Sequence, residues 1–159
     1  MINGTDGSLS NPFVDKNVKA YAFQSDLCRS LYGVYNGSIT IRDNIELWGF
    51  GGNEFIFANA SVNPDNSNFC TPLGNCLGAG LLNMTECMKL SGIGLPLILS
   101  NPHFLFGYDE LLTDVEGISP PELDLHNTLV YIEPLSGIEM KANQRLQFNI
   151  NCINDPKIA

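Results

Sequence analysis

Five cysteines are the first residues of this sequence that could do chemistry: Cys28, Cys70, Cys76, Cys87 and Cys152. No CxxC pair occurs, and the two histidines, His103 and His126, are not spaced as partners in a Cys-His zinc site. Disulfide bonds formed in an oxidising compartment are therefore the better interpretation. An odd number leaves one cysteine unpaired, and spacing alone does not decide which bridges form.

Four Asn-x-Ser/Thr motifs are candidate N-glycosylation sites, at Asn3, Asn36, Asn59 and Asn83. The chain of 159 residues holds 18 Asn and 17 Ser plus Thr, so roughly two such motifs are expected by chance. The alternative is that these Asn-Gly and Asn-Ala-Ser stretches are simply turn sequences. The excess favours glycosylation, and with it passage through the secretory route.

Catalytic motifs of the common enzyme classes are missing from the sequence. It contains no GxSxG, no HExxH and no GxxxxGK[ST]. Ser100, His103 and Asp109 are the residue types of a hydrolase triad. Because the groups of a triad converge from separate elements, a structural histidine is the preferred interpretation. We expect a protein that is not an enzyme and that uses no cofactor and no metal ion.

Charge and hydropathy exclude further classes. Eight Lys plus Arg stand against 17 Asp plus Glu, which gives a net charge of -9 at pH 7. An acidic chain without a basic cluster repels phosphate backbones, so no nucleic-acid partner is expected. No apolar run approaches the roughly 20 residues that a membrane-spanning helix needs.

The start of the chain conflicts with its cysteines and sequons. The first ten residues are polar and glycine-rich and lack the basic start and apolar core of a signal peptide. An oxidised, glycosylated chain needs an entry signal. We therefore expect this sequence to be a piece of a longer protein whose signal lies upstream of Met1.

The element pattern is that of short strands and turns. Fifteen Gly, nine Pro and frequent Asn disfavour long helices. Side-chain alternation or a short apolar run predicts strands at 19–23, 54–58 and 94–99, and helical turns are expected at 25–32 and 108–116. Asn36 and Gly37 suggest a hairpin turn between residue 34 and residues 38–41. The loop 59–80 is long for an unstructured segment, and a Cys70–Cys76 bridge would staple it.

Two further alternating stretches lie near the end of the chain, at 127–133 and 144–153. The turn cluster Pro134-Leu135-Ser136-Gly137 lies between them. We expect these two stretches to pair as an antiparallel hairpin.

Five stretches in order along the chain resemble the class B scavenger receptor family, and more closely its lysosomal branch, the lysosomal integral membrane proteins. The first is the opening INGTDG. The most specific is FCTPLGNCLGAGLLNMTEC. The remaining three are SDLCRSLY, LPLILSNPHFLFGYDELL and HNTLVYIEPLSGIEMKANQRLQFNI, which carries a P-[LI]-[ST]-G turn.

The resemblance implies a fold and a disulfide pattern. The fold is mainly β with short helices, part of a large antiparallel β-barrel ectodomain held between two membrane helices. Residues 1–159 would be the C-terminal half of that lumenal or extracellular ectodomain, with the flanking helices outside this chain. Cys28 would pair with Cys87, and Cys70 with Cys76. Cys152 has no partner in the pattern, and its place on an alternating stretch suggests a buried free thiol.

The resemblance also implies function. Members of the family are membrane receptors and transporters for lipids, lipoproteins and protein ligands, in the lysosomal or endosomal membrane or at the cell surface. The lysosomal branch carries a lysosomal hydrolase, through a region upstream of this chain. The family barrel encloses an apolar tunnel that passes sterols and phospholipids. The alternating stretches 54–58, 127–133 and 144–153 are the candidate wall segments here.

Two other functions are compatible with the sequence. A soluble, secreted β-rich binding module would share the barrel but not the membrane anchors. A lipid-ester hydrolase would have to rely on Ser100, His103 and Asp109.

Overall fold

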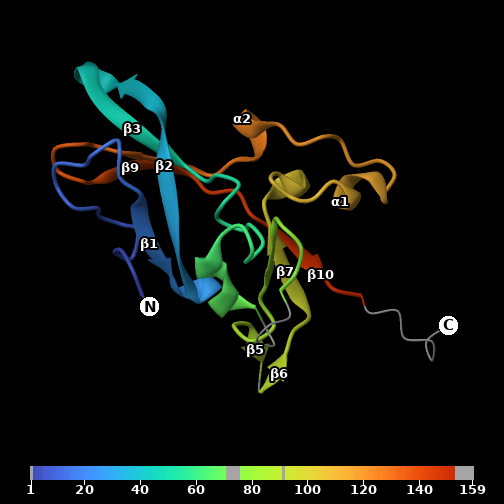
Figure 1. Cartoon of the computed structure of the whole chain (residues 1–159). Helices are drawn as coiled ribbons and strands as arrows, with labels where there is room; N and C mark the ends of the chain where they lie inside the picture. The colour runs from blue at the N-terminus through green and yellow to red at the C-terminus, as the bar shows by residue number, and fades with distance from the viewer. Residues whose placement is uncertain (1, 71–75, 91, 153–159) are drawn as a thin grey trace, which may run out of the picture.

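The computed structural model describes residues 2–70, 76–90 and 92–152 (Figure 1). It is mainly antiparallel β with short helices, as the sequence predicts. The strands are β1 Ala20–Gln24, β2 Arg29–Ile41, β3 Ile45–Gly51, β4 Leu81–Asn83, β5 Lys89–Leu90, β6 Ile93–Gly94, β7 Leu97–Ser100, β8 Leu129–Ile132, β9 Glu139–Asn143 and β10 Gln147–Ile150. The short helices are η1 Ser25–Leu27, η2 Arg42–Asn44, η3 Pro64–Phe69, η4 Pro102–Phe104, α1 Glu110–Thr113 and α2 Leu123–His126.

The largest sheet of the described residues is curled and has five strands, in the order β1-β2-β3-β8-β9 (Figure 1). All neighbouring strands within this sheet are antiparallel. Phe50 of β3 lies between Tyr35 of β2 and Val130 of β8. Because alternate residues of a strand share a face, this register fixes which side chains line each side of the sheet.

Strand β2 runs through Asn36 and Gly37, so the hairpin turn expected there is wrong. The pairing with β3 shifts between Tyr35 and Ser38, which is a β-bulge. Gly37 has a φ of 102°, and glycine supplies that conformation at little cost inside a strand. The chain reverses later, at η2. The helical turns expected at 25–32 are likewise reduced to η1, because Arg29 already begins β2.

The N-terminal residues 4–14, here called the strap, join the two outer strands of this sheet. At one end Thr5 forms a parallel bridge with Ala22 of β1, and its carbonyl accepts from the Phe23 N–H at 2.6 Å. At the other end Leu9 bridges Ile138, and Ser10 N–H donates to the Gly137 carbonyl at 2.8 Å. The strap thus spans the open side of the curled sheet.

A smaller sheet has the strand order β10-β7-β4. Its core is shared with residues 52–63 after β3, here called the crossing segment. Leu99 of β7 and Met84 are fully buried in this core. The segment 54–58, expected as a strand, forms turns instead, although Ile56 and Phe57 are buried. Phe55 is 42% exposed whereas the adjacent Ile56 and Phe57 are both buried, so the alternation of the sequence does not decide which of these side chains enter the core.

Two expectations for the C-terminal part are wrong. The stretch 127–133 does form a hairpin, but β8 pairs with β9, whereas β10 pairs with β7 in the other sheet. The turn 134–137 is short, and a tight turn pairs the strand before it with the residues that directly follow it, which here form β9.

Cys152 is exposed and unpaired, because β10 ends at Ile150 and the chain has left the sheet before the cysteine.

Candidate functional site

A pocket of about 560 Å³ lies on the concave face of the five-stranded sheet. Its wall is mostly apolar and includes Leu31, Phe50 and Val130. Polar residues of the lining include Gln24, Asn101 and Gln144. A concave apolar surface with a few polar groups is the form that small-molecule and lipid sites usually take.

Strand register explains why these side chains meet. Ala20 pairs with Gly33, Phe50 pairs with Val130, and Val130 pairs with Ala142. All five line the pocket, so one face of the sheet supplies the wall. A Cβ added at Gly33 would lie 2.9 Å from the Phe50 Cβ, so glycine lets β3 place its aromatic ring over β2.

The opposite, outer face of the sheet is aromatic and carries basic side chains. The rings of Tyr21 and Tyr32 lie 5.4 Å apart. Lys19 Nζ is 4.1 Å from the Tyr32 ring centre, and Lys141 Nζ is 5.4 Å from that of Tyr131. Strand alternation places the Tyr32 and Tyr131 rings, with the cations over them, on the face opposite Gly33 and Val130, although Tyr21 and Tyr32 also contribute to the pocket lining.

The strap forms part of the pocket rim through Thr5, Asp6, Gly7, Ser8 and Ser10. The hydroxyl of Ser8, and then its backbone N–H, donate to Asp6 and lower the pKa of that carboxyl. Gly4 and Gly137, both at positive φ, lie against the backbone of Tyr21 and Ser10 respectively. The INGTDG and P-[LI]-[ST]-G motifs therefore sit where the strap meets the two edges of the sheet.

Glu139 brings a carboxylate to the same pocket. It begins β9 and pairs with the buried Ile132. Burial raises the pKa of Glu139, because a desolvated carboxyl favours its neutral form. Sequence reasoning missed Glu139, Phe50 and Gly33 as site residues, because the signal for them is the register and not a motif.

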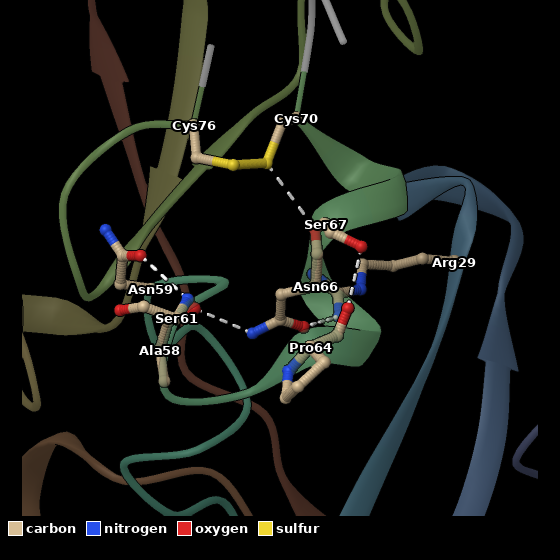
Figure 2. The surroundings of a disulfide bond; sticks show 9 residues. All are labelled: Arg29, Ala58, Asn59, Ser61, Pro64, Asn66, Ser67, Cys70 and Cys76. Atoms are coloured by element: carbon tan, nitrogen blue, oxygen red, sulfur yellow. Dashed lines mark hydrogen bonds between the residues drawn. A yellow bond between two sulfur atoms is a disulfide. The ribbon is translucent and has the colours of Figure 1, made fainter. Parts of the chain in front are cut away.

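Arg29, from the SDLCRSLY motif, lies inside the protein with 7% of its surface exposed. Its guanidinium donates to Asn66 Oδ1 at 2.8 Å and lies 4.0 Å from the Phe69 ring centre. Asn66 in turn donates to the Ala58 carbonyl (Figure 2). Burial lowers the pKa of Arg29 to about 10. The motif arginine thus ties β2 to η3 and holds the crossing segment in place.

The structure contains the two disulfides that the resemblance implies, Cys28–Cys87 and Cys70–Cys76. Their Cα atoms are 5.9 Å and 4.5 Å apart. The first joins the start of β2 to the segment after β4 across 59 residues, and the second closes a loop of 6. The interior of that loop, 71–75, lies outside the described residues.

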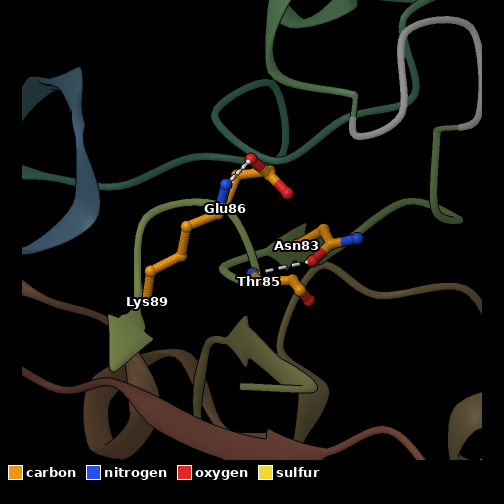
Figure 3. A network of polar contacts seen from close by, with 4 residues as sticks. All are labelled: Asn83, Thr85, Glu86 and Lys89. Atoms are coloured by element: carbon orange, nitrogen blue, oxygen red, sulfur yellow. Dashed lines mark hydrogen bonds and ion pairs between the residues drawn. The ribbon is translucent and has the colours of Figure 1, made fainter. Parts of the chain in front are cut away.

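The four sequon asparagines differ in their surroundings. Asn3, Asn36 and Asn59 are exposed, whereas Asn83 is half-buried. Asn59 Oδ1 accepts from the Ser61 N–H at 3.0 Å (Figure 2), and Asn83 Oδ1 accepts from the Thr85 N–H at 2.9 Å, next to the Glu86–Lys89 ion pair (Figure 3). Both have the short turn that an asparagine forms with the residue two positions later.

The residue types of a hydrolase triad have separate roles. Ser100 is fully buried, and its hydroxyl accepts from Asn149 at 3.0 Å. His103 Nδ1 lies 2.9 Å from the Ser119 carbonyl, and its ring stacks on His126 at 4.2 Å. Asp109 precedes α1, where its carbonyl accepts from the Leu112 N–H. Within the described residues no group of three or more His, Cys, Asp and Glu could hold a metal ion.

Comparison with known proteins gives a consistent result. The profile of the CD36 family matches residues 1–159. The chain is 41% identical over 155 residues to lysosome membrane protein 2 of Homo sapiens, which covers 94% of this chain and 30% of that protein. It is 37% identical over 164 residues to sensory neuron membrane protein 2 of Manduca sexta, with 99% and 30% covered.

The chain therefore spans about three tenths of the length of these curated relatives. In the part of the chain that the structure describes, no helix has the length and apolarity to cross a bilayer.

Proposed function

Because the chain belongs to the CD36 family, the class B scavenger receptors, we propose that residues 1–159 are the C-terminal half of the lumenal or extracellular region of a membrane receptor or lipid-transport protein. The concave pocket binds the apolar part of a lipid. The observation that carries this proposal is that the concave face of the five-stranded sheet, together with Ile56, Phe57 and Leu146, lines a mostly apolar pocket of about 560 Å³.

Several finer features belong to the same proposal. The ligands are sterols, phospholipids or lipoproteins, and a lysosomal hydrolase binds through a region outside this chain. The protein resides in the lysosomal or endosomal membrane or the plasma membrane. In support, the relatives from Homo sapiens and Manduca sexta are both named as membrane proteins.

The cysteines and sequons support the lumenal or extracellular placement. Disulfides persist in oxidising compartments, and the chain holds two. We propose N-glycans at Asn3, Asn36, Asn59 and Asn83. The half-buried Asn83 requires the greatest local opening for modification. Mobility shifts of single Asn→Gln variants after glycosidase treatment test each position.

A pocket-filling variant tests the lipid proposal. Ala142 lines the pocket from β9, and its neighbour Lys141 lies on the outer face. We expect Ala142→Trp to weaken binding of a fluorescent sterol or phospholipid to the intact polypeptide by about tenfold or more, because the indole occupies the ligand volume. Lys141→Trp, the same change one residue away, is the matched control and leaves lipid binding unaltered.

Equal lipid binding by both tryptophan variants and the wild-type protein would contradict the proposal. Thermal unfolding of each variant shows whether the sheet is intact. A loss of binding in Ala142→Trp therefore counts only where its unfolding temperature matches that of Lys141→Trp.

A further inference from the structure

A β-bulge decides which side chain of β9 faces the pocket. Ala142 pairs with Val130 on the pocket side, and Lys141 pairs with Tyr131 on the outer side. Strict alternation would next place Met140 on the pocket side. The register shifts there, so that Glu139 pairs with Ile132. Glu139 lines the pocket, whereas Met140 is absent from its described lining and is 48% exposed.

The bulge therefore exchanges an apolar side chain for a carboxylate at this position. Bulges commonly re-aim a side chain next to a functional site. Burial raises the pKa of Glu139, so the ionised carboxylate is less stable here than in water. A sheet that served only as a structural wall would gain from the methionine.

The charges around the pocket all have one sign. Among its described lining residues, the charged ones are Asp6 and Glu139, and none is Lys or Arg. Lys19 and Lys141 lie over tyrosines on the outer face. Lys16, just after the strap, lies 4.3 Å from the ring centre of Trp48, which is on the pocket face, but Lys16 is not among the described lining residues. Arg145 donates to the Asn127 carbonyl at 2.8 Å.

We propose that the pocket selects lipids whose polar end carries no net negative charge, and that Glu139 enforces this selection. A carboxylate beside an apolar cavity repels an anionic head group, because a head group bound next to it displaces water that would otherwise screen the two charges. The same oxygens accept a hydrogen bond from a hydroxyl or an ammonium group. The ligand class is thus an amphiphile without net negative charge, which is neutral, zwitterionic or cationic.

This inference rests on the proposed lipid binding, and the experiment separates the two. The three probes are amphiphiles with identical alkyl chains. Their head groups are a primary amine, a hydroxyl and a carboxylate. Each competes with a fluorescent lipid for the intact polypeptide that carries residues 1–159, at about pH 7, where the carboxylate probe is ionised. We expect the amine and alcohol to bind roughly tenfold more tightly than the carboxylate.

Three variants assign the selection to its residue. Glu139→Gln keeps the size and shape of the side chain and should bring carboxylate binding close to that of the alcohol. Gln144→Lys places a base at the pocket margin and should favour the carboxylate. Glu116→Gln removes an exposed carboxylate outside the pocket and should leave the order of the three probes unchanged.

Each remaining outcome overturns one of the two proposals. If none of the probes displaces the fluorescent lipid, the lipid function itself fails, and the selectivity with it. Equal binding of all three probes leaves the lipid function standing and overturns the selectivity. A wild-type preference for the amine and alcohol that persists unchanged in Glu139→Gln removes Glu139 as its source.

Discussion

Arg29 is a buried cation that no carboxylate pairs with among the described residues. Its Nε has no hydrogen-bond partner there, while one terminal nitrogen donates to Asn66 and the guanidinium packs on Phe69. A small cavity of about 30 Å³ adjoins it, enough for roughly one water molecule. The residue therefore contributes through packing and one strong hydrogen bond, and not through an ion pair.

We expect Arg29→Ala to lower the free energy of unfolding by roughly 2–4 kcal/mol. The change leaves a cavity beside Phe69 and leaves the Asn66 carbonyl oxygen without its donor. Thermal or urea unfolding measures the effect. Arg42→Ala, at an exposed position of η2, is the control and should change stability by less than about 0.5 kcal/mol. A similar effect of both variants would mean that Arg29 does not hold η3.

Glu139 makes stability depend on pH in a direction that its pKa fixes. The ordinary pKa of a glutamate is 4.5, and burial raises that of Glu139. The folded state therefore binds the proton more tightly than the unfolded state, and stability is lost as the pH rises through the folded pKa.

The Glu139→Gln variant should accordingly be more stable than the wild-type protein near pH 7. The gain should stay under about 1 kcal/mol, because the carboxyl is still partly exposed to screening water. The difference should vanish below about pH 3, where Glu139 is protonated in both the folded and the unfolded state. Unfolding temperatures across this range test the sign. A wild-type protein that is more stable than the variant at neutral pH would show that Glu139 has a stabilising partner.

At the scale of elements, the strap depends on two glycines. A Cβ at Gly137 would overlap the backbone carbonyl of Ser10, and the residue has a φ of 77°. We expect Gly137→Ala to lower the free energy of unfolding by about 2 kcal/mol or more. The cost of a left-handed conformation for alanine and the cost of the backbone clash add to each other. Increased cleavage of residues 4–14 by a protease would report detachment of the strap.

Gly117→Ala is a matched control for that prediction. Gly117 also has a positive φ, of 89°, but its Cβ would meet nothing within 4 Å. It should therefore cost only the backbone strain, about 1 kcal/mol, and leave the strap protected. Equal protease sensitivity in the two variants would argue that the strap does not rest on Gly137.

The two disulfides close loops of very different length, 59 and 6 residues. By the loop-entropy estimate the longer contributes about 4 kcal/mol and the shorter about 2 kcal/mol. Replacement of both cysteines by serine in the Cys28–Cys87 pair should therefore reduce secretion and unfolding temperature more than the same change in Cys70–Cys76. The reverse order would show that the short bridge does more than close its loop.

The whole molecule is held together by one shared core. Leu27 of η1, Phe57 of the crossing segment, Leu82 of β4 and Leu99 of β7 belong to the same buried cluster. The cluster includes residues from the three-stranded sheet and residues adjoining the five-stranded sheet, so the two sheets should unfold together.

Leu99→Ala tests this coupling. We expect a loss of roughly 3–5 kcal/mol, because the side chain is fully buried and its removal leaves a cavity. The transition should stay single when it is followed by fluorescence and by circular dichroism. Ile150→Ala, on the exposed side of β10, should cost little. Two separate transitions in the leucine variant would mean that the sheets unfold independently.

The sequence by itself determined the class of fold, and its ordered motifs indicated the family and the disulfide pairs. Alternation and turn residues suffice for this, because they report local backbone preference and which residues share a face. They placed β1 and β8 within a residue or two. They failed where long-range pairing decides: β2 passes through Asn36–Gly37, and β10 joins β7 instead of β8.

Only the tertiary structure decided the pocket. Which face of the sheet is concave depends on how the five strands curl and on the strap that joins their edges. The placement of Glu139 in the pocket in place of Met140 depends on a register shift. No local pattern encodes that shift, because a bulge exists only relative to the partner strand.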